Sequence, residues 1–98
     1  MNTIKHIQIN QFQLSRLLNE KEKNGYKLLL AEGVYCHTCS GICTEGVEVT
    51  EIHLSYMNDI LIRGTCEVCN WKVARVMEFG EDLAFYDRAN DFRKEQEN

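Results

Sequence analysis

Two cysteine pairs of identical spacing constrain this chain more than any other feature. Cys36 and Cys39 form the first pair, and Cys66 and Cys69 form the second, with two residues between the cysteines of each pair. That separation lets a tight turn direct both sulfur atoms at one ion, and the spacer over 40–65 is long enough for a hairpin that returns to the first pair. Four thiolates at about 2.3 Å would complete a closed tetrahedron. We therefore predict that these cysteines bind one structural metal ion, Zn²⁺.

The size of the chain makes such a site important for folding. Its 98 residues suit a single domain, expected over 1–98. A chain of this length buries only about 60–70% of the surface that it exposes when unfolded, so an ion that joins distant segments adds needed stability. No long apolar run predicts a transmembrane helix, and the first residues lack a secretory signal pattern. We therefore expect a cytoplasmic protein, where reduced cysteines favour metal binding over disulfides.

Alternating side chains predict strands between and after the cysteine pairs. Residues 46–64 alternate apolar and polar side chains on either side of a turn at 57–59, which is typical of a β-hairpin. The alternation changes phase at Glu51, which predicts a β-bulge. A third strand is predicted over 71–79 and is followed by Gly80.

The order of cysteine pair, hairpin, cysteine pair and strand resembles a zinc ribbon over 34–79. In that family each pair forms a knuckle, often followed by Gly in a conformation with positive φ. Ser40 and Gly41 follow the first pair here, and Asn70 follows the second. Asn adopts left-handed conformations more readily than most residues. The lack of Gly directly after Cys39 and of Pro within either pair departs from the family pattern, so no subfamily is assigned.

A helix is predicted before the ribbon, over 11–24. Asn10 is suited to be its N-cap, with Gln13 at the capping-box position, and Ile9 can pack on Leu14 as a hydrophobic staple. Gly25, preceded by Asn24, is a typical helix stop. Residues 26–33 carry a Leu run that fits either a buried strand or a short helix.

A second helix is predicted after the ribbon, over 81–95. Glu81 and Asp82 place negative charge at its start, and Arg93 and Lys94 place positive charge in its last turn, as the helix dipole favours. The expected packing face consists of five apolar side chains: Leu83, Phe85, Tyr86, Ala89 and Phe92. The whole pattern predicts an α+β fold, in which a small three-stranded antiparallel zinc-ribbon sheet is flanked by N- and C-terminal helices. These helices would pack on the ribbon or on a second copy of the chain.

Three further metal-binding side chains are not needed for the site. Cys43 is expected to be a small, semi-buried side chain, with a spare ligand or a reactive thiol as alternatives. His37 lies inside the first knuckle, where four better-spaced cysteines already complete the set. His53 is expected to be an ordinary strand residue.

The charge and the closed site indicate a non-enzymatic protein. A Cys₄ set leaves no open coordination position, and no catalytic triad or phosphate-binding Gly loop stands out. The net charge of −4 favours contact with another protein, in an adaptor or regulatory role, over contact with phosphate backbones. One alternative is a nucleic-acid-binding ribbon that uses a surface composed of Arg63, Trp71, Lys72 and Arg75. A lesser alternative is a rubredoxin-like iron electron carrier.

Overall fold

The structure is a computed structural model that describes residues 6–79 and 82–96. Within these residues the fold is α+β, with three helices, a four-stranded antiparallel sheet and a two-stranded hairpin. The sheet has the order β1 (Ile7–Ile9), β4 (Val47–Leu54), β5 (Ile60–Cys66), β6 (Lys72–Met77). The hairpin joins β2 (Tyr35–Cys36) to β3 (Gly41–Ile42). The helices are α1 (Gln11–Leu17), α2 (Glu20–Glu32) and α3 (Leu83–Gln96).

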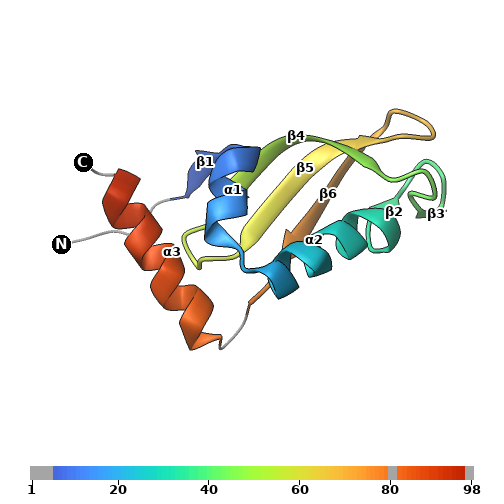
Figure 1. Cartoon of the computed structure of the whole chain (residues 1–98). Helices are drawn as coiled ribbons and strands as arrows, with labels where there is room; N and C mark the ends of the chain where they lie inside the picture. Colours follow the sequence, from blue (N-terminus) through green and yellow to red (C-terminus); the bar gives the residue numbers. More distant parts are fainter. Residues whose placement is uncertain (1–5, 80–81, 97–98) are drawn as a thin grey trace.

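These elements form an elongated molecule with two different ends. Figure 1 shows α1 and α3 at one end of the sheet, the β2–β3 hairpin at the other, and α2 running between them along one side. The principal extents are 43 × 25 × 23 Å. No helix among residues 6–79 and 82–96 is long and apolar enough to cross a membrane.

The sheet contains the predicted ribbon strands and one strand that was not predicted. The strands β4, β5 and β6 form the expected antiparallel meander, and the register shifts between Val49 and Glu51, so the predicted bulge is confirmed. The expectation of three strands is wrong, because β1 pairs with β4 as a fourth. Ile7 lies opposite Leu54, and Ile9 lies opposite Ile52. This short strand continues the apolar face of β4 under α1.

The helix predicted over 11–24 is two helices. Asn10 caps α1 as expected: its side chain accepts from the Gln13 N–H and its N–H donates to the Gln13 side chain, both at 2.8 Å. The chain then leaves the helical conformation at Leu18, and Asn19 starts α2 with the same pair of 2.8 Å bonds to Glu22. Because this second capping box begins a new helix, Gly25 lies inside α2 and does not end it. Residues 26–32 are therefore helical.

The C-terminal helix differs from its prediction in its buried face. Asp82 precedes α3, and its carboxylate accepts a 3.0 Å hydrogen bond from the Phe85 N–H; Glu81 lies outside the described residues. Phe85, Ala89 and Phe92 are buried, as their spacing of four and three residues along one helix face allows. Leu83 and Tyr86 are 74% and 47% exposed, so their assignment to the packing face is wrong.

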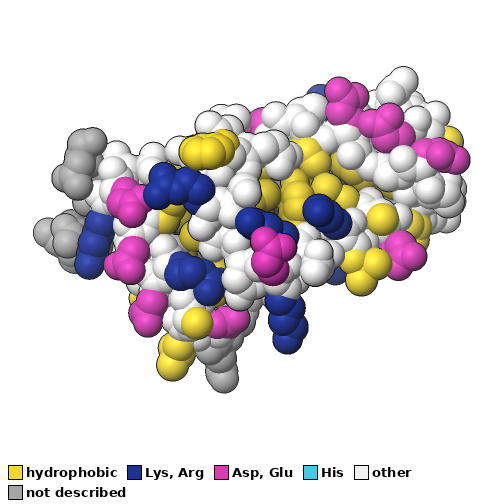
Figure 2. All heavy atoms as spheres, in the orientation of Figure 1, with side chains coloured by type: hydrophobic (Ala, Val, Ile, Leu, Met, Phe, Trp, Pro, Cys, Tyr) yellow, Lys and Arg dark blue, Asp and Glu magenta, His cyan; other side chains and the backbone are white. Residues whose placement is uncertain are grey.

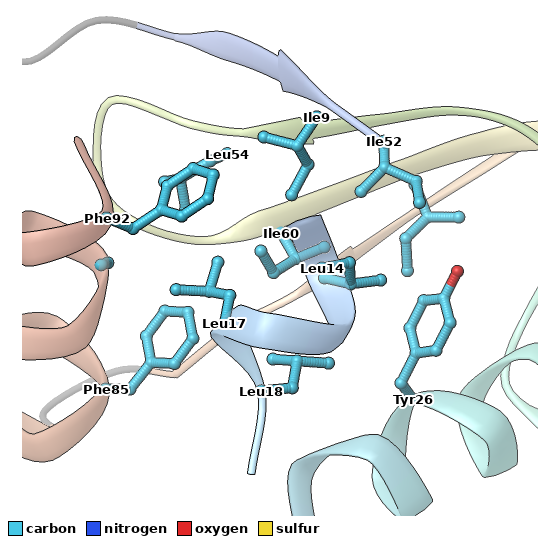
Figure 3. Close-up of a cluster of buried hydrophobic side chains, with 12 residues drawn as sticks. Ile9, Leu14, Leu17, Leu18, Tyr26, Ile52, Leu54, Ile60, Phe85 and Phe92 are labelled. Carbon is cyan, nitrogen blue, oxygen red and sulfur yellow. The ribbon is translucent and has the colours of Figure 1, made fainter. Parts of the chain in front are cut away.

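A large core fills the space between the sheet, α1 and α3. Figure 3 shows side chains from both helices directed at the strands, with Phe85 and Phe92 of α3 facing Leu17 and Leu54. Phe85 also stacks on Phe79, with the ring centroids 3.6 Å apart. The members of the large core are Ile9, Leu14, Leu17, Leu18, Tyr26, Ile52, Leu54, Ile60, Ile62, Phe85, Ala89 and Phe92.

The tip of the β4–β5 hairpin is held against α3. Asn58 is buried and adopts a left-handed conformation, with φ 63°. Its amide group donates to Asn90 at 3.3 Å and accepts from Arg93 at 2.9 Å. Asp59 accepts a 3.4 Å hydrogen bond from the backbone of Phe79. The tip is therefore part of the packed structure and does not project from it.

Candidate metal centre

Both cysteine pairs lie at the turns of β-hairpins. The first turn joins β2 to β3, where Cys36 lies opposite Gly41. The second joins β5 to β6, where the Cys66 N–H donates to the Trp71 carbonyl at 2.9 Å. The strands thus bring together two turns that are distant in sequence, as the spacing of the cysteines predicts.

A left-handed residue follows the second cysteine of each pair. Ser40 has φ 56° and Asn70 has φ 62°. The Asn70 N–H closes its turn on the Cys66 carbonyl at 2.7 Å, and the Ser40 N–H donates to the His37 carbonyl at 3.2 Å. The first knuckle therefore has the expected backbone shape even though Ser stands where Gly is the easiest residue. The residue type at position 40 does not by itself indicate this conformation, because Ser adopts it less readily than Gly or Asn.

The four sulfur atoms form one compact cluster, called here the four-cysteine cluster: Cys36, Cys39, Cys66 and Cys69. All four atoms lie within 4.8 Å of one another. Two contacts join the pairs, at 3.4 Å between Cys36 and Cys69 and 3.9 Å between Cys39 and Cys66. A tetrahedral site with bonds of about 2.3 Å has sulfur–sulfur edges of about 3.8 Å. The cluster is therefore compatible with one metal ion.

The surroundings of the sulfurs differ from one cysteine to the next. Cys36 and Cys66 are fully buried, Cys69 is half-buried and Cys39 is exposed. The backbone N–H groups of Cys69 and Val68 point at the Cys66 sulfur and lower the pKa of that thiol to about 6. The Cys39 N–H donates to the Cys36 sulfur at 3.5 Å. Each turn therefore offers N–H groups to the first sulfur of its pair, which offsets the negative charge of a thiolate.

Cys39 holds its proton more tightly than a free cysteine does. Hydrogen bonding with Cys69, followed by desolvation and the other thiols, raises the pKa of Cys39 to about 12. Thiolates crowded together repel one another, so a bound cation would favour release of the Cys39 proton. This donor set suits a soft divalent ion, which binds as protons are released.

The other candidate ligands lie outside the four-cysteine cluster. Cys43 is fully buried, and burial followed by its hydrogen bond to Cys66 raises the pKa of its thiol to about 12. His37 is exposed. His53 pairs with Glu51 at 3.0 Å and packs on the ring of His6 at 4.8 Å, on the sheet.

Cys36 and Cys66 also belong to a second buried group in the described part of the chain, called here the small core: Val34, Cys36, Cys43, Cys66 and Val73. The β-strand partner of Val73 is Gly64, where a side chain does not fit, because an added Cβ would lie 2.1 Å from the Glu48 carbonyl oxygen. A Gly inside a strand pattern is the signal of such a close backbone approach. Gly64, inside the hairpin predicted over 46–64, carries this signal in the sequence.

The predicted basic surface is divided between the two faces of the sheet. Arg63 lies opposite Ala74 and Lys72 lies opposite Thr65, whereas Arg75 lies opposite Ile62. Directly paired residues share a face and successive residues alternate, so Arg75 is on the face opposite to Arg63 and Lys72. Trp71, 55% exposed, lies between Asn70 and β6. The four side chains do not form one continuous patch.

Comparison with known proteins adds no family to this picture. No protein-family model matches the chain, and no curated protein or solved structure matches it either. The four-cysteine cluster is a candidate metal site defined by its own geometry.

Proposed function

We propose that this chain is a non-enzymatic zinc-ribbon protein, in which one structural Zn²⁺ maintains a surface for contact with another protein. The closed set of four sulfur atoms from two hairpin turns carries the proposal. Such a set has no vacant position for a substrate, so the ion would act on folding. The ribbon assignment is supported by the meander of β4, β5 and β6 and by the left-handed residue after each pair.

The metal content of the purified protein tests the identity of the ion. A tetrahedral set of four sulfurs suits both zinc and iron, so the iron electron carrier is the competing hypothesis. We expect elemental analysis to find one zinc per chain and a colourless sample. A coloured sample with one iron per chain would replace the proposal with the electron carrier, and a protein without metal would remove both.

Contact with a protein is favoured over contact with nucleic acid by the charges on the sheet. Arg63 lies directly opposite Glu51, and Glu48 lies opposite Thr65, which in turn lies opposite Lys72. Acidic side chains thus alternate with the cations on this face and weaken its attraction for phosphates. We expect salt-titrated binding assays to find no salt-dependent affinity for single-stranded DNA or RNA. A steep salt dependence that Lys72→Ala reduces would favour the nucleic-acid alternative.

The role of the ion in maintaining a binding surface is tested with a matched pair of proteins. Cys66→Ser removes one ligand, whereas Cys43→Ala leaves the four-cysteine cluster complete. We expect a partner from the native host, expected in its cytoplasm, to be retained by the wild-type protein and by Cys43→Ala, and lost with Cys66→Ser. A partner that binds all three equally would show that the contact does not depend on the metal.

A further inference from the structure

Strand β6 leaves one edge of the sheet open. Within the described residues it pairs with β5 alone, over the six residues Lys72–Met77. The opposite edge is covered in part by β1, and the rest of β4 carries the bulge near Glu51, a feature that discourages further pairing. The β6 segment carries no bulge in its register with β5, and the chain contains no proline. Among residues 6–79 and 82–96, it therefore offers six consecutive residues of regular edge to another strand.

The backbone groups on this edge can be assigned from the hydrogen-bonding pattern. The bond from the Cys66 N–H to the Trp71 carbonyl makes these two residues a hydrogen-bonded pair. Because such pairs alternate along an antiparallel ladder, residues 73, 75 and 77 direct their polar groups at β5. Lys72, Ala74 and Val76 therefore direct their N–H and C=O groups away from the sheet.

A groove runs beside this edge. It has a volume of about 640 Å³ and is lined by Gly25 and Leu29 of α2 and by β6 residues that include Ala74, Arg75 and Met77. Figure 2 shows hydrophobic side chains at the surface between α2 and the sheet, with Lys and Arg side chains beside them. The groove offers room for apolar side chains of an added strand on the side of the sheet that α2 covers.

The charges along β6 decide what kind of strand fits. Lys72 and Arg75 are exposed, and no carboxylate in the described part of the chain forms an ion pair with either. Antiparallel pairing with a second copy would bring four cations along one seam. The register that sets Lys72 against Glu78 of the second copy also sets Arg75 against Arg75, and like charges directly opposite are destabilising. An acidic partner strand avoids both the four cations along one seam and the direct opposition of two arginines.

We propose that β6 binds an extended, acidic and apolar segment of another protein as a fifth antiparallel strand. Its main chain would bond to Lys72, Ala74 and Val76. Its apolar side chains would enter the groove beside α2, next to Leu29 and Met77, and its carboxylates, on the other face of the sheet, would lie near Lys72. This mode of recognition combines main-chain affinity with side-chain specificity. The inference rests on the proposed protein-contact function and assigns its surface.

Substitution of Ala74 tests whether binding takes place at the β6 edge and not at another surface. Ala74→Pro removes an N–H that points away from β5, so the β5–β6 ladder keeps its bonds, whereas Ala74→Val retains the N–H and serves as the matched control. The probe is a phage-displayed library of random linear peptides selected on the zinc-loaded full chain. We expect the selected peptides to alternate apolar and acidic residues. They should bind Ala74→Pro at least about tenfold more weakly than Ala74→Val.

Amide hydrogen exchange of the wild-type protein provides a second measurement that needs no variant. A selected peptide should slow exchange at Lys72, Ala74 and Val76, while the amides at Val73 and Arg75 are already protected by β5. Unchanged exchange at the three outward amides would overturn the proposal. So would equal binding of the peptides to both Ala74 variants, or dimerisation of the wild-type chain that Ala74→Pro abolishes.

These outcomes are distinguishable from a failure of the proposed function. Peptides that bind both Ala74 variants equally but lose binding with Cys66→Ser would leave the metal-dependent contact in place and move it away from β6. Binding that follows the Ala74 pair but survives metal removal would support the edge strand and contradict the role of the ion.

Discussion

The two ends of this molecule are stabilised by different physical means. Among the described residues, the large core at the helical end contains twelve buried side chains, nearly all apolar, from β1, α1, α2, β4, β5, α3 and Leu18 between α1 and α2. The small core at the metal end contains five, and three of these are cysteines. Burial of apolar surface contributes about 25 cal/mol per Å², so packing is the main stabilising interaction at the helical end. The metal end has too few apolar side chains for this, and we expect a bound ion to supply the difference.

The largest expected effect follows from removing one ligand at the metal end. Structural zinc contributes about 10–16 kcal/mol in small peptides, comparable with the whole stability of a typical domain. Cys66→Ser should abolish stoichiometric zinc binding and disorder residues 34–46 and 64–73, while amide signals from α1 and α3 persist in NMR spectra. Cys43→Ala should retain one zinc. Loss of all amide signals in one step would show that the two ends fold as a single unit.

The next effect is expected from the large core. Phe85 is 1% exposed and lies between Phe79 and Arg88, whose guanidinium is 5.6 Å from the ring. Phe85→Ala should lower the free energy of unfolding by about 3–5 kcal/mol, because it leaves a cavity that packed neighbours fill only in part. The matched control is Leu83→Ala on the same helix, expected within about 0.5 kcal/mol of wild type.

Denaturant unfolding and zinc titration together show whether the loss of stability in Phe85→Ala is confined to the helical end. If the ends are stabilised separately, Phe85→Ala lowers the unfolding midpoint and leaves the zinc affinity of the native protein unchanged. A matching loss of zinc affinity would mean that the large core also positions the sulfur atoms.

Gly64 lies where the two ends meet, and its substitution should affect both. It pairs with Val49 beside the bulge and with Val73 of the small core. Since a Cβ here would lie 2.1 Å from the Glu48 carbonyl oxygen, Gly64→Ala must separate β4 from β5 locally. We expect a loss of about 1–3 kcal/mol in stability together with weaker zinc binding. Gly41→Ala is the control: the new Cβ has open space around it, so this substitution should change neither the stability nor the zinc affinity.

The metal end could be predicted from the sequence to a greater extent than the helical end. The positions of Cys36 and Cys66 in equal pairs, and the phase change at Glu51, are local signals that survive in the structure. The strand β1 has only three residues, and its existence depends on pairing with Leu54, far along the chain. A three-residue pattern cannot specify such a partner.

The division of the first helix is signalled in the sequence by a second capping-box pattern. Asn19 and Glu22 have the same spacing as Asn10 and Gln13, and both pairs form capping boxes. The prediction of one helix over 11–24 depends on the helix-stop pattern at Gly25, although an exposed Gly inside a helix costs only about 1 kcal/mol relative to Ala. Burial of Phe85 rather than Leu83 depends on how α3 is rotated against the sheet, which its own sequence does not determine.

The smallest expected effect concerns Ser40, whose left-handed backbone conformation in the first knuckle is unfavourable for a residue with a side chain. Ser40 adopts φ 56°, a conformation that costs an L-residue roughly 1–2 kcal/mol and glycine almost nothing. Ser40→Gly should therefore stabilise the zinc-loaded protein by up to about 1 kcal/mol, a gain partly offset by the greater freedom of glycine in the unfolded chain. Asn70→Gly is the control, because Asn already tolerates this conformation, and its effect should be smaller.

Competition with a zinc chelator measures this difference most directly. If the turn forms only when the ion binds, relief of strain at Ser40 appears as tighter zinc binding, by up to about fivefold for 1 kcal/mol. If the turn is already formed without the ion, Ser40→Gly raises the stability of the metal-free protein instead and leaves the affinity unchanged. The first result would extend the contrast between the two ends to the backbone of the knuckle itself, and the second would show that the hairpin β2–β3 is preorganised. Tighter binding from Asn70→Gly than from Ser40→Gly would contradict the assignment of strain to the first knuckle.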